Sequence, residues 1–299
     1  MKIPVAGMIK IAIASGKGGT GKTFVAVNMV YVLRQNGYRV LLVDCDAEAP
    51  NSLLFFKTRM VSQTEISHLV PVIDTEKCTF CSKCHDYCNY NAILILPPAK
   101  FIKVIEDLCH GCGACSVACS YNAISGKAFS LGMVTQLADN QNNRFSEARM
   151  NTGIMSPVPV IKAAIKHIYP DEEIVILDSP PGTSCPFIQT VATADYVVLV
   201  TEPTPFGLSD LRNSVETLRK MGKKFGVVVN RAGLGNSEVY SYLKNETIKL
   251  LFEIPFKKEY SRLSSEGRIV AMEDRKFADN LLMATEILIS DNGTGSYKR

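Results

Sequence analysis

The sequence has no tryptophan, and it has no apolar run that approaches the roughly 20 residues needed to span a bilayer. Its start, MKIPVAGMIKIAIASGKGG, lacks the long apolar stretch and the small-residue cleavage site of a secretory signal peptide. We therefore expect a cytoplasmic protein that has no membrane partner. Residues 1–7 precede the strand-like run that follows Met8, and we expect them to be a dispensable extension or a misassigned start, without a structural role.

The sequence also has little excess of charge of either sign. Lys plus Arg number 33 and Asp plus Glu number 29, which leaves a formal net charge of +4 over 299 residues. So small an excess does not indicate a nucleic-acid partner. Hydrophobic residues make up 46% and charged residues 21% of the chain, so composition argues for a folded core and against disorder or a coiled coil. The length fits one large α/β domain or one domain with a small insertion.

Outside a cysteine-rich segment, continuous apolar runs alternate with helical stretches. Such runs are typical of strands buried on both faces of a parallel sheet, and they cover residues 9–15, 39–44, 173–178, 196–202 and 225–230. Helices are predicted where a Gly or Pro stop signal follows a helical pattern, over residues 22–36, 158–168 and 208–221. The predicted fold class is therefore α/β, with a mostly parallel sheet flanked by helices.

Eight of the ten cysteines fall between Cys78 and Cys119, which indicates metal ligation rather than disulfides in a cytoplasmic protein. The segments CTFCSKCHDYCNYNAI and CHGCGACSVACSYNAI align without gaps at an offset of 31 residues. Each contains C-x2-C-x2-C-x3-C, the spacing of bacterial ferredoxins, in which the fourth cysteine reaches the other cluster. We predict two 4Fe-4S clusters, one on Cys78, Cys81, Cys84 and Cys119 and one on Cys109, Cys112, Cys115 and Cys88.

Zinc is the alternative metal, because paired C-x2-C motifs also build zinc ribbons. A C-x2-C-x2-C triplet, however, leaves its third thiolate badly placed for a tetrahedral site. Asn89 and Ser120 replace the proline that usually follows the fourth cysteine, which loosens the turn but removes no ligand. His85 and His110 stand beside cysteines, and we expect them to donate hydrogen bonds or face water rather than bind metal.

The alternation of strands and helices stops after Leu54 and resumes near Pro157. We therefore interpret the cysteine segment as a small α+β unit inserted into the α/β domain. The parent domain is placed at residues 1–60 and 126–299, and the insertion at residues 61–125. Within the parent domain, residues 127–153 are predicted to form a hairpin or loops.

Residues 16–23, GKGGTGKT, match the phosphate-binding loop G-x-x-x-x-G-K-[ST] and lie between a predicted strand and a predicted helix. Lys22 would reach the β and γ phosphates, and Thr23 would bind magnesium. The sequence thus predicts a site for ATP or ADP with Mg²⁺. Backbone N–H groups would surround the phosphate oxygens along the rest of the loop, which consists of Gly16, Lys17, Gly18, Gly19, Thr20 and Gly21.

Lys17 is the unusual residue of this loop, because a second lysine is not required to hold one nucleotide. With it, GKGGTGKT resembles the deviant Walker A loop of the MinD/ParA/nitrogenase iron protein superfamily of P-loop ATPases. The resemblance implies an Mg²⁺-dependent ATPase, slow without a partner, that forms a homodimer with ATP at the interface. Lys17 would then reach across the dimer to the nucleotide of the other subunit, and a solvated loop lysine is the alternative.

Further motifs resemble the same superfamily. Asp44 and Asp46 follow the second strand as switch I acids; Asp46 would orient the attacking water and Asp44 would hold magnesium-bound water, or the reverse. Asp178 opens DSPPG, a Walker B and switch II segment, where it would lie on the magnesium shell while Gly182 moves with the γ phosphate. Asn230 stands where the family contacts adenine, and a strand-end turn residue is the alternative. The implied catalytic residues are Lys17, Lys22, Asp44 and Asp46.

Together, the two parts resemble MinD-superfamily ATPases that carry an inserted ferredoxin domain. The C-terminal Cys-x-x-Cys pair of Mrp/Nbp-type cluster carriers is missing, which weakens that more specific assignment. Cys45 and Cys185 lie outside the cluster set, and we expect them to be small buried residues. Cys185, beside switch II, is the better candidate for a shared metal or a transferred cluster.

The resemblance implies that ATP-driven dimer and switch changes are coupled to electron transfer through the clusters to a redox partner protein. The insertion begins about 15 residues after the switch I acids, close enough in sequence for such coupling. An ATP-dependent factor that builds or hands over a cluster to an accepting protein is the alternative. A positioning ATPase of the ParA or MinD type is less favoured, because the last helix, near residues 273–290, lacks the basic face of a membrane-surface helix.

Overall fold

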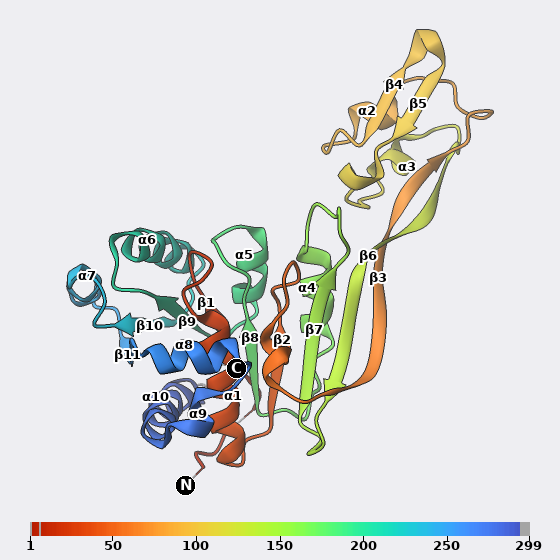
Figure 1. Cartoon of the computed structure of the whole chain (residues 1–299). Helices are drawn as coiled ribbons and strands as arrows, with labels where there is room; N and C mark the ends of the chain where they lie inside the picture. Colours follow the sequence, from red (N-terminus) through yellow and green to blue (C-terminus); the bar gives the residue numbers. More distant parts are fainter. Residues whose placement is uncertain (1, 6, 294–299) are drawn as a thin grey trace, which may run out of the picture.

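A nine-stranded sheet between layers of helices forms the body of the protein in the computed structural model (Figure 1). The structure describes residues 2–5 and 7–293. The strand order is β11-β10-β9-β1-β8-β2-β7-β6-β3, and neighbouring strands pair in parallel except where β6 runs antiparallel to β7 and β3. The α/β class with a mostly parallel sheet flanked by helices is thus confirmed.

The elements follow one another in simple order along the chain. The strands are β1 (Ile9–Ala14), β2 (Val40–Asp44), β3 (Arg59–Ile73), β4 (Ile93–Leu96), β5 (Phe101–Val104), β6 (Ile124–Ala138), β7 (Arg144–Met150), β8 (Ile174–Asp178), β9 (Tyr196–Thr201), β10 (Phe225–Ala232) and β11 (Leu250–Pro255). The α-helices are α1 (Lys22–Gln35), α2 (Lys83–Asp86), α3 (Ala114–Ala118), α4 (Val158–Lys166), α5 (Cys185–Ala192), α6 (Pro205–Lys220), α7 (Glu238–Asn245), α8 (Lys258–Ser265), α9 (Val270–Glu273) and α10 (Arg275–Gly293). Three short 3-10 turns are η1 (Ser52–Phe55), η2 (Pro97–Ala99) and η3 (Glu106–Leu108).

The predicted apolar runs form the centre of the sheet, as β1, β2, β8, β9 and β10. Every residue of β2 and β8 is buried, which explains why these strands show no polar alternation. The predicted helices are α1, α4 and α6; α6 begins earlier than predicted because Thr204 caps it by accepting a hydrogen bond from the Gly207 N–H. The predicted hairpin over residues 127–153 is confirmed as the antiparallel pair β6–β7.

Two apolar clusters cover the two faces of the sheet. Helices α1, α8, α9 and α10 pack on one face, and α4, α5, α6 and α7 pack on the other. In residues 2–5 and 7–293, no helix is both long and apolar enough to cross a membrane.

Beyond the end of β7, strands β3 and β6 continue as a two-stranded ribbon (Figure 1). Pairing of β6 with β7 stops at Gly132, whereas pairing with β3 continues to Ile73. At about 3.3 Å per residue, residues 67–73 make a ribbon about 23 Å long. Residues 74–123, with α2, α3 and the β4–β5 hairpin, lie at its tip, and we call residues 67–130 the arm. The predicted insertion, residues 61–125, therefore begins within β3.

The start of the chain contacts the body. Lys2 Nζ lies 2.7 Å from Glu173 Oε1 and 3.0 Å from the carbonyl oxygen of Gly37, and the Ile3 N–H donates to the Tyr38 hydroxyl at 2.8 Å. Because of these contacts, the expectation that residues 1–7 have no structural role is wrong for Lys2 and Ile3. Residues 1 and 6 lie outside the described residues.

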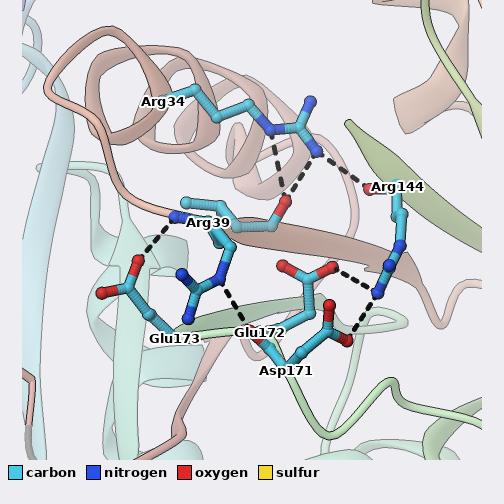
Figure 2. Close-up of polar contacts among 7 residues, drawn as sticks. Arg34, Arg39, Arg144, Asp171, Glu172 and Glu173 are labelled. Carbon is cyan, nitrogen blue, oxygen red and sulfur yellow. Dashed lines mark hydrogen bonds and ion pairs between the residues drawn. The ribbon is translucent and has the colours of Figure 1, made fainter. Parts of the chain in front are cut away.

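Arginine side chains join the end of α1 to the starts of β2 and β7 (Figure 2). The phosphate loop lies at the opposite end of α1. The Arg34 guanidinium donates to the carbonyl oxygen of Val40 at 2.7 Å and of Arg144 at 2.9 Å, and it lies 4.3 Å from the centre of the Phe145 ring. Burial lowers the pKa of Arg34 to about 10, so the group stays charged at neutral pH. Arg144 in turn pairs with Asp171 at 2.6 Å.

We predict that Arg34→Ala lowers the free energy of unfolding by about 2 kcal/mol, because two carbonyl groups lose a charged donor in a half-buried place. Denaturation in urea measures the loss. The matched control is Arg39→Ala, which removes an exposed guanidinium that donates to the Asp171 carbonyl at 2.8 Å. We expect this control to change stability by no more than about 0.5 kcal/mol. Equal losses in the two variants would contradict the role given to Arg34.

Candidate functional site

The predicted phosphate loop lies between the end of β1 and the start of α1. Gly19 and Gly21 have φ angles of +79° and +98°, a left-handed conformation that favours glycine. A Cβ atom on Gly21 would overlap the amide nitrogen of Asn230, so a larger residue there would displace the Asn230 side chain. Asn230 Nδ2 donates to the carbonyl oxygen of Thr20 at 2.8 Å, which ties the end of β10 to the loop.

A cavity of about 800 Å³ opens beside this loop, at the carboxyl ends of the parallel strands. Gly18, Gly19, Gly21, Lys22 and Thr23 line it on one side. Asp46, Asn230 and residues of the loop after β11 line it elsewhere. The volume is typical of small-molecule sites, and crevices at this edge of an open α/β sheet are where such folds bind ligands.

Lys22 is buried at the floor of the cavity, 3.5 Å from the Lys17 carbonyl oxygen. Burial lowers the pKa of Lys22, and the charges of Asp178 and Asp46 oppose this shift. Lys17 is placed differently, because its side chain is only half-buried and its carbonyl oxygen accepts a hydrogen bond from Ser15 Oγ at 2.6 Å. The two lysines of the loop therefore have separate surroundings.

Asp178, the last residue of β8, is fully enclosed beside the loop. Neither of its carboxylate oxygens has a hydrogen-bond partner among the described residues. Burial raises the pKa of Asp178 well above its usual range, and the neighbouring charge of Asp44 raises it further. A buried carboxylate without partners, next to the Thr23 hydroxyl position, fits the oxygen ligands that Mg²⁺ prefers.

The two switch I acids have different places. Asp44 accepts hydrogen bonds from the N–H groups of Asn51 and Ser52 at 2.9 and 2.8 Å and from the Ser52 hydroxyl at 2.7 Å. Burial raises the pKa of Asp44 to about 6. Asp46 instead lines the cavity, where burial raises the pKa of its carboxyl and the Lys22 charge opposes the rise. This geometry favours Asp46 for contact with a nucleotide and its water, and Asp44 as the residue that holds the loop.

Several cavity-lining residues lie outside the sequence motifs, among them Arg231, Lys257 and Tyr260. Arg231 lies 2.6 Å from Glu202 Oε1, and Lys257 Nζ lies 2.9 Å from the Tyr260 hydroxyl. The only sequence signal was the position of Arg231 directly after Asn230. Lys257 and Tyr260 reach the cavity because β11 lies beside β10, a neighbour relation that the sequence does not reveal.

The cysteines outside the two predicted quartets differ in exposure. Cys45 is fully buried, as expected, and burial raises the pKa of its thiol well above the usual range. Cys185, the first residue of α5, is exposed, so the expectation of burial is wrong for this residue. The buried side of α5 consists of Phe187, Thr190 and Val191, which leaves Cys185 outside the core.

The eight remaining cysteines line two cavities at the tip of the arm. One cavity, of about 20 Å³, is lined by the first predicted quartet, Cys78, Cys81, Cys84 and Cys119. The other, of about 200 Å³, is lined by the second quartet, Cys88, Cys109, Cys112 and Cys115. In the described part of the chain, no three His, Cys, Asp or Glu side chains form a group that could hold a metal ion.

The backbone around the cysteines repeats as the sequence does. Phe80 and Gly111 both have left-handed φ angles, and their N–H groups donate to Cys78 Sγ and Cys109 Sγ at 3.4 Å. Hydrogen bonds of this kind stabilise thiolates, and they tune Fe–S clusters. His85 Nδ1 lies 2.7 Å from the Ile93 carbonyl oxygen, which can only accept, so this ring nitrogen donates as expected. Thiols are the ligands that 4Fe-4S clusters use, but among the described residues no three of these cysteines lie close enough together to form a metal site.

Comparison with known proteins gives related sequences in archaea. An uncharacterized protein of Methanocaldococcus jannaschii is 30% identical over 238 residues, which is 78% of this chain and 83% of that protein. An iron-sulfur cluster carrier protein of Pyrococcus horikoshii is 24% identical over 227 residues, 74% of this chain but only 60% of the carrier.

Solved structures share the fold at lower identity. The septum site-determining protein MinD of Pyrococcus horikoshii, in complex with Mg-ADP, superposes with a TM-score of 0.57 at 19% identity and covers 94% of this chain and 96% of that one. The family model of the CobQ/CobB/MinD/ParA nucleotide binding domain matches residues 11–270, which include the phosphate loop and the cavity. The chain therefore belongs to the CobQ/CobB/MinD/ParA nucleotide-binding domain family.

Proposed function

We propose that this MinD/ParA-like ATPase hydrolyses ATP as a homodimer and couples its nucleotide state to electron transfer through two 4Fe-4S clusters. The observation that carries the proposal is the pair of cysteine quartets, each around its own cavity, on an arm of a nucleotide-binding body. We divide the chain into an ATPase domain, residues 1–60 and 126–299, and an inserted ferredoxin-like domain, residues 61–125. The cytoplasm is the proposed location, because it keeps thiols reduced.

The phosphate loop and the cavity supply the nucleotide chemistry. Backbone N–H groups of residues 16–21 and the Lys22 ammonium bind the phosphates. Thr23 and Asp178 would hold Mg²⁺, with Asp44 behind them, and the ion would supply positive charge next to the phosphates. Asp46, on the cavity wall, orients the water that attacks the γ phosphate. The Mg-ADP complex of the MinD with the same fold supports this choice of ligand.

The same edge of the sheet presents the proposed dimer surface. Leu54 lines the cavity and is 78% exposed, and Phe206, at the start of α6, is equally exposed. Covering apolar side chains of this size with a partner removes them from water and favours association. Lys17 is on the phosphate loop, and a second subunit that closes over the cavity would bring its own nucleotide within reach of it.

The cysteine quartets would hold the clusters, which when bound supply one-electron redox chemistry. The body residues keep water away from the central strands, and the arm presents its tip to a redox partner protein. Tyr87 and Val117, which lie within the two cysteine motifs, are 61% and 88% exposed. Such exposed apolar groups next to ligand cysteines suit a short-lived contact with a partner.

A second function, ATP-dependent assembly or transfer of a cluster, is favoured by the similarity to the iron-sulfur cluster carrier protein of Pyrococcus horikoshii. The exposed thiol of Cys185 is the candidate transient ligand. The two functions differ in the fate of the clusters. An electron carrier keeps all its iron through ATP turnover, whereas a donor loses iron to an acceptor protein that lacks a cluster.

We predict that the anaerobically purified protein contains about eight irons and eight sulfides per chain, because each of two cubanes brings four of both. Cys81→Ser should remove chiefly one cluster from the electron paramagnetic resonance and iron analyses. The matched control Cys185→Ser, outside both quartets, should keep all the iron. Bound zinc, or iron for a single cluster, would show that the ferredoxin interpretation is wrong.

Lys22→Ala is predicted to abolish binding of ATP and ADP, measured by isothermal titration calorimetry. The substitution removes the one buried ammonium from a loop that otherwise offers neutral N–H groups to the phosphates. The control is Lys257→Ala, which removes an exposed ammonium that is already paired with Asp274. This variant should weaken binding much less. Undiminished affinity in the Lys22 variant would place the nucleotide elsewhere.

Lys17→Ala is predicted to separate binding from dimerisation. Because Lys17 acts on the nucleotide of the other subunit, its loss should leave ATP binding to the monomer intact while it blocks ATP-dependent dimerisation and hydrolysis. Light scattering with and without ATP measures the dimer. Normal dimerisation of this variant would return Lys17 to the role of a solvated loop lysine.

A further inference from the structure

The arm leaves the body at a β-bulge. The pairing of β3 with β6 shifts register between Ile66 and Ser67, which face Gly132 and Ser130, so Leu131 has no partner in β3. A bulge bends the strand that contains it and increases its twist. Leu131 itself is buried in the apolar cluster of the body. The bulge therefore lies at the base of the arm and is anchored in the core of the body through Leu131.

Gly132 binds the bulge closely to the end of β7. It pairs with Met150, the last residue of β7, and its φ angle is +157°. A Cβ atom at this position would overlap the carbonyl oxygen of Arg149 and lie 2.7 Å from the Met150 Cα. No side chain fits between the two strands here, so the bulge and the end of β7 lie in close backbone contact.

The end of β7 is also bonded to the loop between β2 and η1, residues 45–51, which contains Asp46 and which we call the switch I loop. The Met150 N–H donates to the carbonyl oxygen of Ala47 at 2.9 Å, and Ala47 follows Asp46, which lines the nucleotide cavity. The next residue, Asn151, turns back to the bulge: its N–H donates to the Leu131 carbonyl oxygen at 2.9 Å, and its Nδ2 donates to Ser130 Oγ at 3.0 Å. Two consecutive residues thus hold the switch I loop and the base of the arm.

The same segment then passes beside the arm. Ile154, Met155 and Ser156 line a crevice together with Cys109, a member of the second cysteine quartet, and its neighbour His110. Residues 150–156 therefore bond to the switch I loop and to the bulge, and they border a crevice that one cysteine of the arm also lines. The sequence suggested that the switch I acids connect to the arm through β3. That link is longer, because β3 begins at Arg59 and runs along the edge of the sheet before it reaches the bulge.

We propose that residues 150–156 are the coupling element of this protein, which transmits a change of the switch I loop to the orientation of the arm. A γ phosphate that moves Asp46 and Ala47 changes the hydrogen bond to Met150, and Asn151 carries that change to the bulge. The inference deepens the proposed function and rests on its nucleotide site, but it does not depend on the clusters being present. Such coupling requires that the nucleotide bind the two arm orientations with different affinity.

Hydrogen–deuterium exchange of the full chain, with Mg²⁺ and with or without a non-hydrolysable ATP analogue, tests the proposal. In the wild type we expect slower exchange at residues 16–23 and a nucleotide-dependent change at residues 128–133 and 150–156. Asn151→Ala, which removes the side-chain bond to Ser130 and keeps the backbone bonds, should keep the protection of residues 16–23 and reduce the change at residues 128–133. The matched control is Gln63→Ala, which removes an exposed cross-strand bond to Thr135 at 3.2 Å in the same hairpin, on the body side of the bulge, and should respond as the wild type.

Each other outcome is decisive. Protection of residues 16–23 with no change at residues 128–133 in the wild type would overturn the coupling but leave the proposed nucleotide site intact. A full response in Asn151→Ala would overturn the route through this residue. Absence of protection at residues 16–23 would overturn the proposed nucleotide site itself, and with it the coupling.

Discussion

Neighbouring strands of a parallel sheet end at the same edge, and the functional residues of this protein depend on that constraint. Strand β8 lies between β1 and β2, and the register places Asp178 directly beside Asp44. The phosphate loop follows β1 on the adjacent strand, so Lys22 comes to the same place from a third direction. No local sequence signal sets these neighbours; the crossover helices and the burial of all three strands do.

Bringing these groups together has a cost, which the pKa directions express. Asp178 and Asp44 are both pushed toward their neutral forms, and Lys22 is pushed the same way, although the opposite charges between them reduce the effect. A ligand that brings a cation to Asp178 would satisfy two carboxylate oxygens that have no hydrogen-bond partner among the described residues. A ligand that binds the folded state and not the unfolded chain raises the free energy of unfolding. Its binding also offsets the free-energy cost of burying polar groups without partners.

The arm depends on a different feature, which is that the strand pair β3–β6 extends beyond the rest of the sheet. From Gly132 to Ala138, β6 pairs with both β7 and β3 and is part of the body. From Ile124 to Ser130, β6 pairs with β3 alone. A two-stranded ribbon can twist and bend more than a broad sheet, and the bulge places that freedom at one point. The cysteine sites are therefore held away from the body, yet their base is bonded to the loop that lines the nucleotide cavity.

The sequence by itself determined the central strands, the phosphate loop and the grouping of cysteines into two quartets, because each is written in a local period or spacing. It did not predict β3 or β11 as strands. In β3, RMVSQTEISHLVPVI, most side chains are exposed, so the continuous apolar run that marks a buried strand is missing. Only the tertiary structure decided that Asp46 faces the cavity while Asp44 holds the loop, and that Lys257 and Tyr260 join the site. The same holds for the link from Ala47 through Met150 to the arm, since contacts between residues about a hundred positions apart arise from packing and register rather than from any pattern along the chain.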